Sequence, residues 1–381
     1  MTGTVWRPRV PRARHRSGRC HSPQDAMRSG EAIQQKRSAL GFVIAAATAL
    51  CATLALAPYP VSAEEGVAER GVPYLTIRNT TGDADPARYY GDERGGLDAG
   101  YCDIAERKLE ILTSVAEAAP FRIPDEILRV ENVRPTPIDD VLDTLAETSD
   151  GAAPLMYTHG FYIDFEKGCR RATVLQESAG LEGRFMWFSW PSNGSLLNYT
   201  HDEADLYWSV LDLAETIVRL EERFGPGQVN LAGHSLGGRG MVLAIHDVAA
   251  QRPDVMLGDV VLLAPDMDFD VFARLLPRIR PIVRSITVYV ADKDRPLAIS
   301  ENVHGYPRLG QSGNDVSRLE GVDVIDLSDL RVQSPTGHLY HVYNDEVGAD
   351  LSQLLSEGLP PASRRNMLQV GPNLWRLQRE K

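Results

Sequence analysis

The stretch Gly233-His234-Ser235-Leu236-Gly237, followed by Gly238, decides the fold class of this chain. Residues 229–232 before it form a short apolar run typical of a buried strand, and residues 236–250 after it have helical spacing. A serine between glycines at a strand–turn–helix junction is the pattern that holds a nucleophilic hydroxyl clear of a parallel sheet. Ser235 is therefore a candidate nucleophile; a plain glycine-rich turn is the alternative.

From residue 150 onward, apolar runs alternate with segments of helical period, which predicts an α/β fold. Its mostly parallel central sheet would be covered by helices on both faces. We expect strands over 154–158, 185–190, 229–232, 259–263, 286–290 and 322–327, with helices between them, most clearly over 206–224 and 236–250.

The parts on either side of this 151–357 core are less regular. In the lead-in, 64–150, we expect early strands over 73–78 and 101–107, and a mostly helical segment over 123–146 that Pro135-Thr136-Pro137 interrupts. These strands either extend the edge of the same sheet or form a small separate lobe. The tail, 358–381, is expected to be a peripheral extension past the last helix.

Length and charge limit the function classes. The 381 residues are 43% hydrophobic and 24% charged, which suits one large or two modest globular domains. The net charge is −12, but the first 63 residues are basic, so residues 64–381 carry −19. A surface this anionic repels phosphate backbones and anionic lipids, which argues against nucleic-acid partners and peripheral membrane binding.

The N-terminal segment, 1–63, has the features of a signal peptide. Lys36-Arg37 precede an apolar run over 39–58, and Val61-Ser62-Ala63 offers small residues for cleavage. The long leader before it suggests that translation starts at Met27. An uncleaved membrane anchor is the alternative, and either way the body is expected to be exported. Export leaves Cys102 and Cys169, either a disulfide or two buried thiols.

A second apolar strand runs into His159-Gly160-Phe161, ahead of the nucleophile strand. Stabilising the oxyanion formed in acyl transfer needs two backbone N–H groups, and this order predicts that Phe161 and Leu236 supply them. His159 is expected to shape this loop rather than to act as a base.

A serine nucleophile needs a histidine base and a carboxylate behind it, in the chain order Ser, acid, His. Asp292 and Asp294 both follow the strand over 286–290, and we prefer Asp294 because it lies further into the turn. Asp266 and Asp268 are second choices whose other role is helix capping. Of the three histidines that follow, we choose His338, which lies in a polar loop, and expect His304 and His341 to be satisfied near the surface.

Aromatic and apolar side chains near these motifs are candidates for a substrate pocket: His159, His234, Trp187, Trp190, Leu196, Leu197 and Tyr199. Packing inside the fold is an equally good explanation for them. The sequence has no His-x-His or Cys-x-x-Cys cluster, so we expect neither metal nor cofactor.

With these motifs in place, the sequence resembles the α/β-hydrolase superfamily, and within it a bacterial group of uncharacterised esterase/lipase-like hydrolases. The resemblance covers residues 73–356. Its motifs here are Tyr90-Gly91-Asp92-Glu93-Arg94-Gly95, His159-Gly160-Phe161, Phe188-Ser189-Trp190-Pro191-Ser192, Gly233-His234-Ser235-Leu236-Gly237, Ala264-Pro265-Asp266, Asp294-Arg295, His304-Gly305 and Gly337-His338. It implies the same three residues, Ser235, Asp294 and His338, as nucleophile, acid and base.

The sequence thus predicts an exported serine hydrolase that cleaves small or polymeric carboxylic esters. Peptidase or acyltransferase chemistry would use the same residues. A non-catalytic binding module on the same scaffold is the alternative class.

Overall fold

The structure is a computed structural model that describes residues 70–106, 125–193, 198–331, 333–334 and 336–379. The predicted export segment, 1–63, lies outside the described residues, as do Leu196 and Leu197. Within the described part, no helix is long and apolar enough to cross a membrane.

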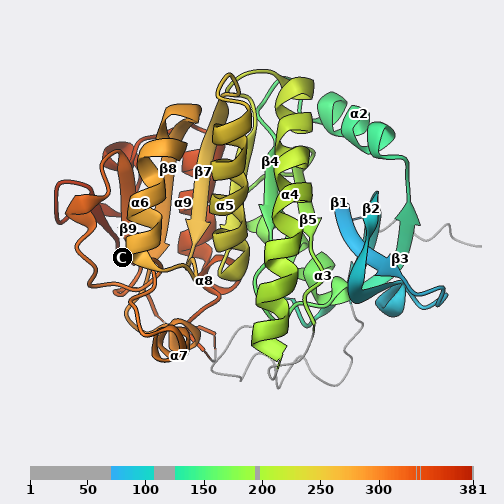
Figure 1. Ribbon diagram of the computed structural model, residues 1–381, viewed down its shortest axis with the longest axis horizontal. Coiled ribbons are helices and arrows are strands. Elements are labelled where there is room, and N and C mark those ends of the chain that lie inside the picture. The colour runs from blue at the N-terminus through green and yellow to red at the C-terminus, as the bar shows by residue number, and fades with distance from the viewer. Residues whose placement is uncertain (1–69, 107–124, 194–197, 332, 335, 380–381) are drawn as a thin grey trace, which may run out of the picture. The chain divides into compact units, whose positions relative to one another are not determined.

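The described strands form one eleven-stranded sheet in the order β10-β11-β9-β8-β7-β6-β4-β5-β1-β2-β3 (Figure 1). Neighbours from β1 through β5, β4, β6, β7, β8 and β9 to β11 are parallel, whereas β2, β3 and β10 are antiparallel to their partners. The strands are β1 (Arg70–Thr80), β2 (Tyr90–Glu106), β3 (Leu128–Pro135), β4 (Leu155–Thr158), β5 (Phe185–Ser189), β6 (Asn230–His234), β7 (Leu257–Leu263), β8 (Val283–Val290), β9 (Val322–Asp326), β10 (Met367–Gln369) and β11 (Leu374–Leu377).

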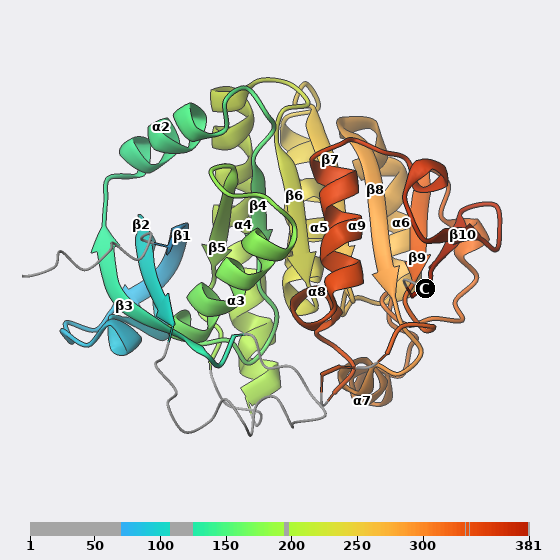
Figure 2. The ribbon, with the colours of Figure 1, turned by 180° about the vertical axis from the view of Figure 1, so that it is seen from behind.

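Helices cover both faces of this sheet, as the alternating pattern predicts. Figure 1 shows α4, α5 and α6 in front of the sheet, and Figure 2 shows α3, α8 and α9 on the opposite face. The helices are α2 (Ile138–Thr148), α3 (Phe165–Ser178), α4 (Tyr199–Phe224), α5 (Leu236–Gln251), α6 (Phe269–Ile279), α7 (Arg295–His304), α8 (Tyr340–Tyr343) and α9 (Asp345–Leu355).

The central strands are apolar throughout because each of them contributes to two cores. Successive side chains of a strand point to opposite faces. On β7, Val260 and Leu262 pack into the core under α4, α5 and α6, while Val261 and Leu263 pack into the core under α3 and α9. A strand buried on both faces needs a continuous apolar run, and this is the signal that the sequence carries.

The parallel strands all end at the same edge of the sheet, where α7 lies in both views (Figures 1 and 2). The loops after β4, β6, β7, β8 and β9 therefore converge there. Ligands of open parallel sheets bind at this carboxyl edge.

The structure corrects the expectation of a mostly helical segment over 123–146. Residues 128–135 form strand β3, which pairs antiparallel with β2, and only then does helix α2 begin. Leu128, Val130 and Val133 of β3 are buried among exposed neighbours, a pattern of a half-buried edge strand. The early strands belong to the main sheet and do not form a separate lobe.

The tail is also part of the fold, contrary to the expected peripheral extension. Strands β10 and β11 close one edge of the sheet, and Trp375 and Leu377 are buried. Arg364 lies fully buried and donates to Asp350 of α9 over 2.9 Å. Strands of three and four residues are too short to give a periodic signal, so only their pairing with β9 defines them.

Cys102 and Cys169 form a disulfide in the structure. It ties β2, in the antiparallel extension of the sheet, to α3, the helix after the His159-Gly160-Phe161 loop. This bond decides between the two possibilities that the spacing of the cysteines left open.

Candidate active site

Ser235 lies in the tight turn between β6 and α5 with φ of 54° and ψ of −123°. A positive φ is strained for a residue with a side chain and persists only where the surroundings impose it. Here the backbone of β7 and its loop imposes it: the Ser235 N–H donates to Leu263 O over 3.0 Å, and the Ser235 carbonyl accepts from the Asp266 N–H over 3.0 Å. The hydroxyl is thus presented at the carboxyl edge of the sheet.

The glycines of the motif are required by close packing of backbone. A Cβ on Gly233 would lie 2.7 Å from the Gly238 Cα, and one on Gly237 would lie 2.1 Å from His159 O. Both distances are shorter than real Cβ contacts. The spacing of the motif therefore brings the loop after β4 directly against the nucleophile turn.

That loop and the start of α5 each contribute one backbone N–H near Ser235. Gly160 is close enough that a Cβ on it would lie 2.8 Å from the Ser235 Cβ. The N–H of Phe161 follows it, and the N–H of Leu236 opens α5; within the described residues, neither donates a hydrogen bond. The pair has the composition of an oxyanion hole, with the positive end of the α5 dipole behind it.

His159 fixes the shape of this loop. Burial, together with the charge of Arg78, holds the pKa of His159 well below its ordinary value, so its ring is neutral. Its Nδ1–H donates to Gly160 O over 2.9 Å, and its backbone carbonyl accepts from the Trp190 indole over 2.8 Å. The two rings stack at 5.1 Å. Because a trans peptide points its C=O and N–H in opposite directions, the bond to Gly160 O orients the Phe161 N–H away from His159.

Of the four candidate acids, the structure brings Asp294 to a histidine. The Nδ1–H of His338 donates to Asp294 Oδ2 over 2.6 Å, and Asp294 Oδ1 caps α7 by accepting from the Leu297 N–H over 3.0 Å. Asp292 is half-exposed beside Lys293. Asp268 caps α6 through the Val271 N–H. With its Nδ1 engaged, His338 keeps its Nε2 as the basic nitrogen.

Asp266, the remaining candidate acid, makes its hydrogen bonds and ion pairs with groups other than a histidine. It is buried and bound by Arg308 over 2.8 Å and by the hydroxyls of Tyr199 and Ser300 over 2.5 and 2.6 Å. Burial favours the neutral acid, but Arg239 and Arg308 outweigh it and lower the pKa of Asp266.

His338 lies next to the nucleophile turn through its contact with His234. The His234 Nε2–H donates to the His338 carbonyl over 3.2 Å, and the two rings lie 4.6 Å apart. The described contacts include no hydrogen bond from the Ser235 hydroxyl to His338. Such bonds are often long before substrate binds, so this geometry is compatible with a role of His338 as the base for Ser235.

His341 is buried, which corrects the expectation that it lies near the surface. Its ring packs 4.4 Å from that of His234, and its Nε2 lies 3.5 Å from the Tyr157 hydroxyl. Burial, aided by Arg171 and His338, lowers its pKa to about 3. A histidine this weakly basic is a poor general base at neutral pH. His304 is half-buried in contact with Glu203.

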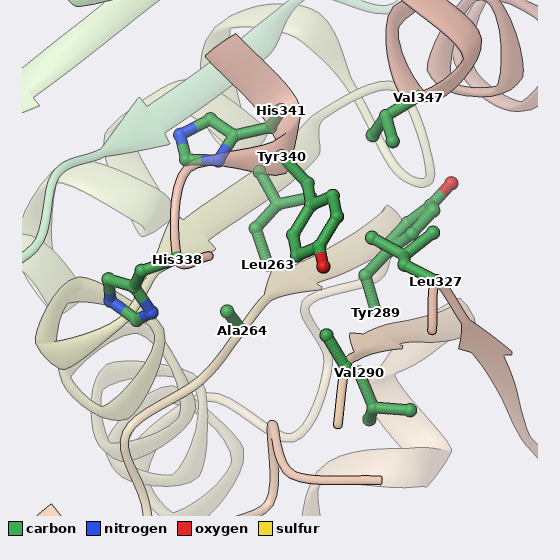
Figure 3. Close-up of a pocket in the computed structure, with 10 residues that line it drawn as sticks. Leu263, Ala264, Tyr289, Val290, Leu327, His338, Tyr340, His341 and Val347 are labelled. Carbon is green, nitrogen blue, oxygen red and sulfur yellow. The ribbon is translucent and has the colours of Figure 1, made fainter. Parts of the chain in front are cut away.

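A small cavity of about 10 Å³ lies beside His338 and His341 (Figure 3). It has room for no more than about one water molecule. Its lining is mostly apolar and consists of Leu263, Ala264, Tyr289, Val290, Ala291, Leu327, His338, Tyr340, His341 and Val347.

Of the candidate pocket residues that the structure describes, none lines this cavity. His159 and Trp190 are buried in their mutual stack, Trp187 packs in the core against α3, and His234 packs against His338. Among the described candidates, Tyr199 lies beside Phe161 of the loop after β4, with its ring 5.2 Å from that of Phe161.

Several functional candidates escape sequence reasoning. Arg239, Arg308, Glu203 and Ser300 join Asp266, Tyr199 and His304 in one polar cluster behind the nucleophile turn. These residues come from five different segments between 199 and 308, and no short motif connects them. Only Asp266 and His304 stand in motifs that the sequence singles out.

The geometry agrees with a comparison of the sequence with known families. The model of the family described as alpha/beta hydrolase of unknown function (DUF900) matches residues 138–357, more than half of the chain. The chain belongs to this family. The family's description as an alpha/beta hydrolase agrees with the fold of this chain, a mostly parallel sheet with helices on both faces. No curated protein matches the sequence.

Solved structures similar to this chain include other hydrolases. A predicted CIB-like hydrolase from Thermoplasma acidophilum is 17% identical, with 54% of this chain and 88% of that chain covered and a TM-score of 0.33. The esterase of Pyrobaculum calidifontis is 16% identical, with 54% and 76% covered and a TM-score of 0.31. Est1E from Butyrivibrio proteoclasticus, solved with ferulic acid, is 13% identical, with 54% and 90% covered and a TM-score of 0.34.

Proposed function

We propose that this α/β hydrolase is a serine esterase that cleaves carboxylic esters through an acyl-enzyme. Ser235 would be the nucleophile, His338 the general base and Asp294 the acid that orients it. The observation that supports this most directly is the 2.6 Å contact between His338 Nδ1 and Asp294 Oδ2, next to a serine held at positive φ. A carboxylate on Nδ1 fixes the tautomer in which Nε2 can accept a proton.

In the acylation step, the Ser235 Oγ attacks the ester carbonyl carbon while its proton passes to His338 Nε2. The carbonyl oxygen becomes an anion, which the N–H groups of Phe161 and Leu236 are placed to bind. The C–O bond to the alcohol then breaks, and the proton on His338 goes to the departing alcohol oxygen. Asp294 stays ionised and stabilises the imidazolium that forms between these transfers.

Deacylation repeats the sequence with water. A water molecule gives its proton to His338 Nε2 and adds to the acyl carbon; Ser235 Oγ then leaves with that proton, and the carboxylic acid is released. Every proton and electron pair in the two steps is supplied by the chain, the ester or water.

Two other uses of the site differ from ester hydrolysis in one step each. A peptidase would release an amine in the first step, and an acyltransferase would accept an alcohol in place of water in the second. A non-catalytic binding module would carry the same fold without forming an acyl-enzyme.

We also propose that the chain is exported. The signal-like segment over 1–63 supports this, and so does the Cys102–Cys169 disulfide, because such bonds persist mainly in oxidising compartments.

A fluorophosphonate probe tests the proposed nucleophile, because it reacts only with an activated serine. We expect the wild-type chain to be labelled and to hydrolyse p-nitrophenyl esters, and Ser235→Ala to lose both. His338→Ala should reduce both to background, and ester hydrolysis by the wild type should fall reversibly in acid, because protonated His338 cannot accept a proton.

The outcomes separate the function classes. Labelling that persists in Ser235→Ala would overturn the nucleophile, and a wild type that never labels would favour the binding module. A panel of esters of increasing acyl length, with peptide and alcohol-acceptor substrates beside it, then distinguishes esterase from peptidase and acyltransferase.

A further inference from the structure

Helix α7 carries the proposed acid at its first turn. Asp294 is the N-cap residue of α7, with one carboxylate oxygen on the Leu297 N–H and the other on His338. A shift of the helix therefore moves Asp294 relative to His338. The position of α7 sets the geometry of the pair.

The other end of α7 is held by His304, its last residue. The Nε2 of His304 lies 3.0 Å from Glu203 Oε1 on α4, and its Nδ1 lies 2.8 Å from the Ser300 carbonyl oxygen. Arg239 binds the same oxygen of Glu203. His304 thus joins α7 to α4 across the catalytic edge of the sheet.

The contacts of the His304 ring suit one charge state. The Ser300 carbonyl oxygen and the Glu203 carboxylate are acceptors. Ser300 Oγ, 3.2 Å from His304 Nδ1, gives its own proton to Asp266, so it too faces the ring as an acceptor, and both ring nitrogens must donate. A neutral imidazole has a single N–H and would turn a lone pair toward one of the two acceptors. The imidazolium has an N–H on each nitrogen and satisfies both.

The charges around His304 are otherwise balanced. The groups that face it or connect to it are Glu203 and the Tyr199 ring on α4, Arg239 on α5, Asp266 after β7 through Ser300 Oγ, and Arg308 on Asp266. Two carboxylates oppose two guanidinium groups, so the proton on His304 adds one positive charge, directly beside Glu203.

The same cluster reaches the nucleophile. Arg239 Nε donates to Asp266 O over 2.6 Å, and the Asp266 N–H donates to Ser235 O over 3.0 Å. Ser300 Oγ, one turn before His304, donates to Asp266 Oδ1 over 2.6 Å. One end of α7 thus carries Asp294, and the contacts near its other end lead through Asp266 to the backbone of Ser235.

We infer that His304 is a positioning residue whose imidazolium form holds α7 against α4, and so keeps Asp294 aligned with His338 and Ser235. This inference rests on the proposed function for its effect on catalysis, but not for its effect on the His338–Asp294 contact. Loss of the proton would remove the charge attraction to Glu203 and turn a ring lone pair toward either Glu203 or the Ser300 carbonyl, which would loosen α7.

NMR of the full 15N-labelled chain tests the contact without any substrate. The proton shared by His338 Nδ1 and Asp294 should give a separate downfield signal, and both ring nitrogens of His304 should be protonated in acid. As pH rises, we expect the downfield signal to weaken at the pH where His304 loses its proton. Glu203→Gln and His304→Gln should weaken it at every pH, whereas His246→Gln on α5, the matched control, should leave it unchanged.

Kinetics test the consequence. His304→Gln and Glu203→Gln should lower kcat by about 10- to 100-fold with little change in KM, because a displacement of about 1 Å can cost 100-fold. His304→Lys keeps a cation beside Glu203 and should retain activity at alkaline pH where the wild type declines.

Either of two results would overturn the inference: a His304 ring that is neutral across the whole pH range, or a downfield signal that survives in both His304→Gln and Glu203→Gln. Failure of the proposed function would look different. In that case the wild type would not react with the fluorophosphonate probe, while the signal would still respond to His304.

Discussion

Gly160 and Ser235, which are 75 positions apart in the sequence, lie in direct contact: a Cβ on Gly160 would come within 2.8 Å of the Ser235 Cβ and 3.0 Å of His234 Nδ1. The loop after β4 can therefore approach the nucleophile turn only with a glycine at this position. The approach places Phe161, the next residue, near the turn that Leu236 follows.

Gly160→Ala should reduce ester hydrolysis by about 10²-fold or more. The added methyl group must push the loop away from Ser235, and losing one oxyanion donor costs 10²- to 10³-fold in kcat. The rest of the fold should remain intact. Circular dichroism and the His338–Asp294 NMR signal check this. Gly96→Ala, where the added atom meets nothing within 4 Å, is the matched control. Full activity of Gly160→Ala would remove Phe161 from the oxyanion site.

Asp294→Asn should lower kcat by about 10⁴-fold, whereas Asp292→Asn should have a mild effect. An amide at position 294 can present its N–H₂ to His338 Nδ1 and favour the wrong tautomer, but the half-exposed Asp292 side chain makes no contact with His338 in the described structure. Steady-state kinetics on both variants are the measurement. If the two effects are reversed, Asp292 is the acid; if both are mild, Asp266 returns as a candidate.

Acid should destabilise the fold through its buried neutral histidines. Burial lowers the pKa of His341 to about 3, whereas an unfolded histidine titrates near 6.5. Between these values the unfolded chain binds a proton that the folded chain does not. Stability should thus fall as pH decreases from about 6.5 toward 3, by up to about 1.4 kcal/mol per pH unit for this residue.

Urea unfolding of the wild type and His341→Asn at pH values from 7 to 4.5 measures this contribution. The free energy of unfolding should depend less steeply on pH in His341→Asn, by about one proton. Tyr157→Phe, which removes the hydroxyl 3.5 Å from His341 but keeps the histidine, should retain the wild-type slope. Equal slopes in wild type and His341→Asn would show that His341 is protonated in the folded state.

Reduction of the Cys102–Cys169 disulfide should destabilise the chain by about 4 kcal/mol. The bond closes a loop with a sequence separation of 67, and the chain-entropy model gives a few kcal/mol for a loop of this length. Urea unfolding with and without a thiol reductant measures the difference. The double variant Cys102→Ser, Cys169→Ser should be less stable than the wild type and insensitive to reductant. A wild type whose free energy of unfolding is the same with and without reductant would contradict the disulfide.

Much of the fold could be predicted because its signals are local. The strand, turn and helix around Ser235 are contiguous, and each central strand is an apolar run because it is buried on both faces. Edge elements lack such signals. Strand β3 was expected to be helical, and β10 and β11 in the tail were not expected at all, because short or half-buried strands are defined by the neighbours with which they pair.

The order of the loops can be read from the sequence. Because parallel strands all end at one edge, this order predicts that Ser235, the aspartates after β8 and His338 gather there. Which carboxylate meets His338 depends on packing between distant segments. Asp294 does so because it caps α7, and α7 is held in place by Ser300 and His304 through contacts with Asp266 and Glu203. The burial of His341 was decided in the same way, because burial and charge depend on neighbours that are distant in the sequence.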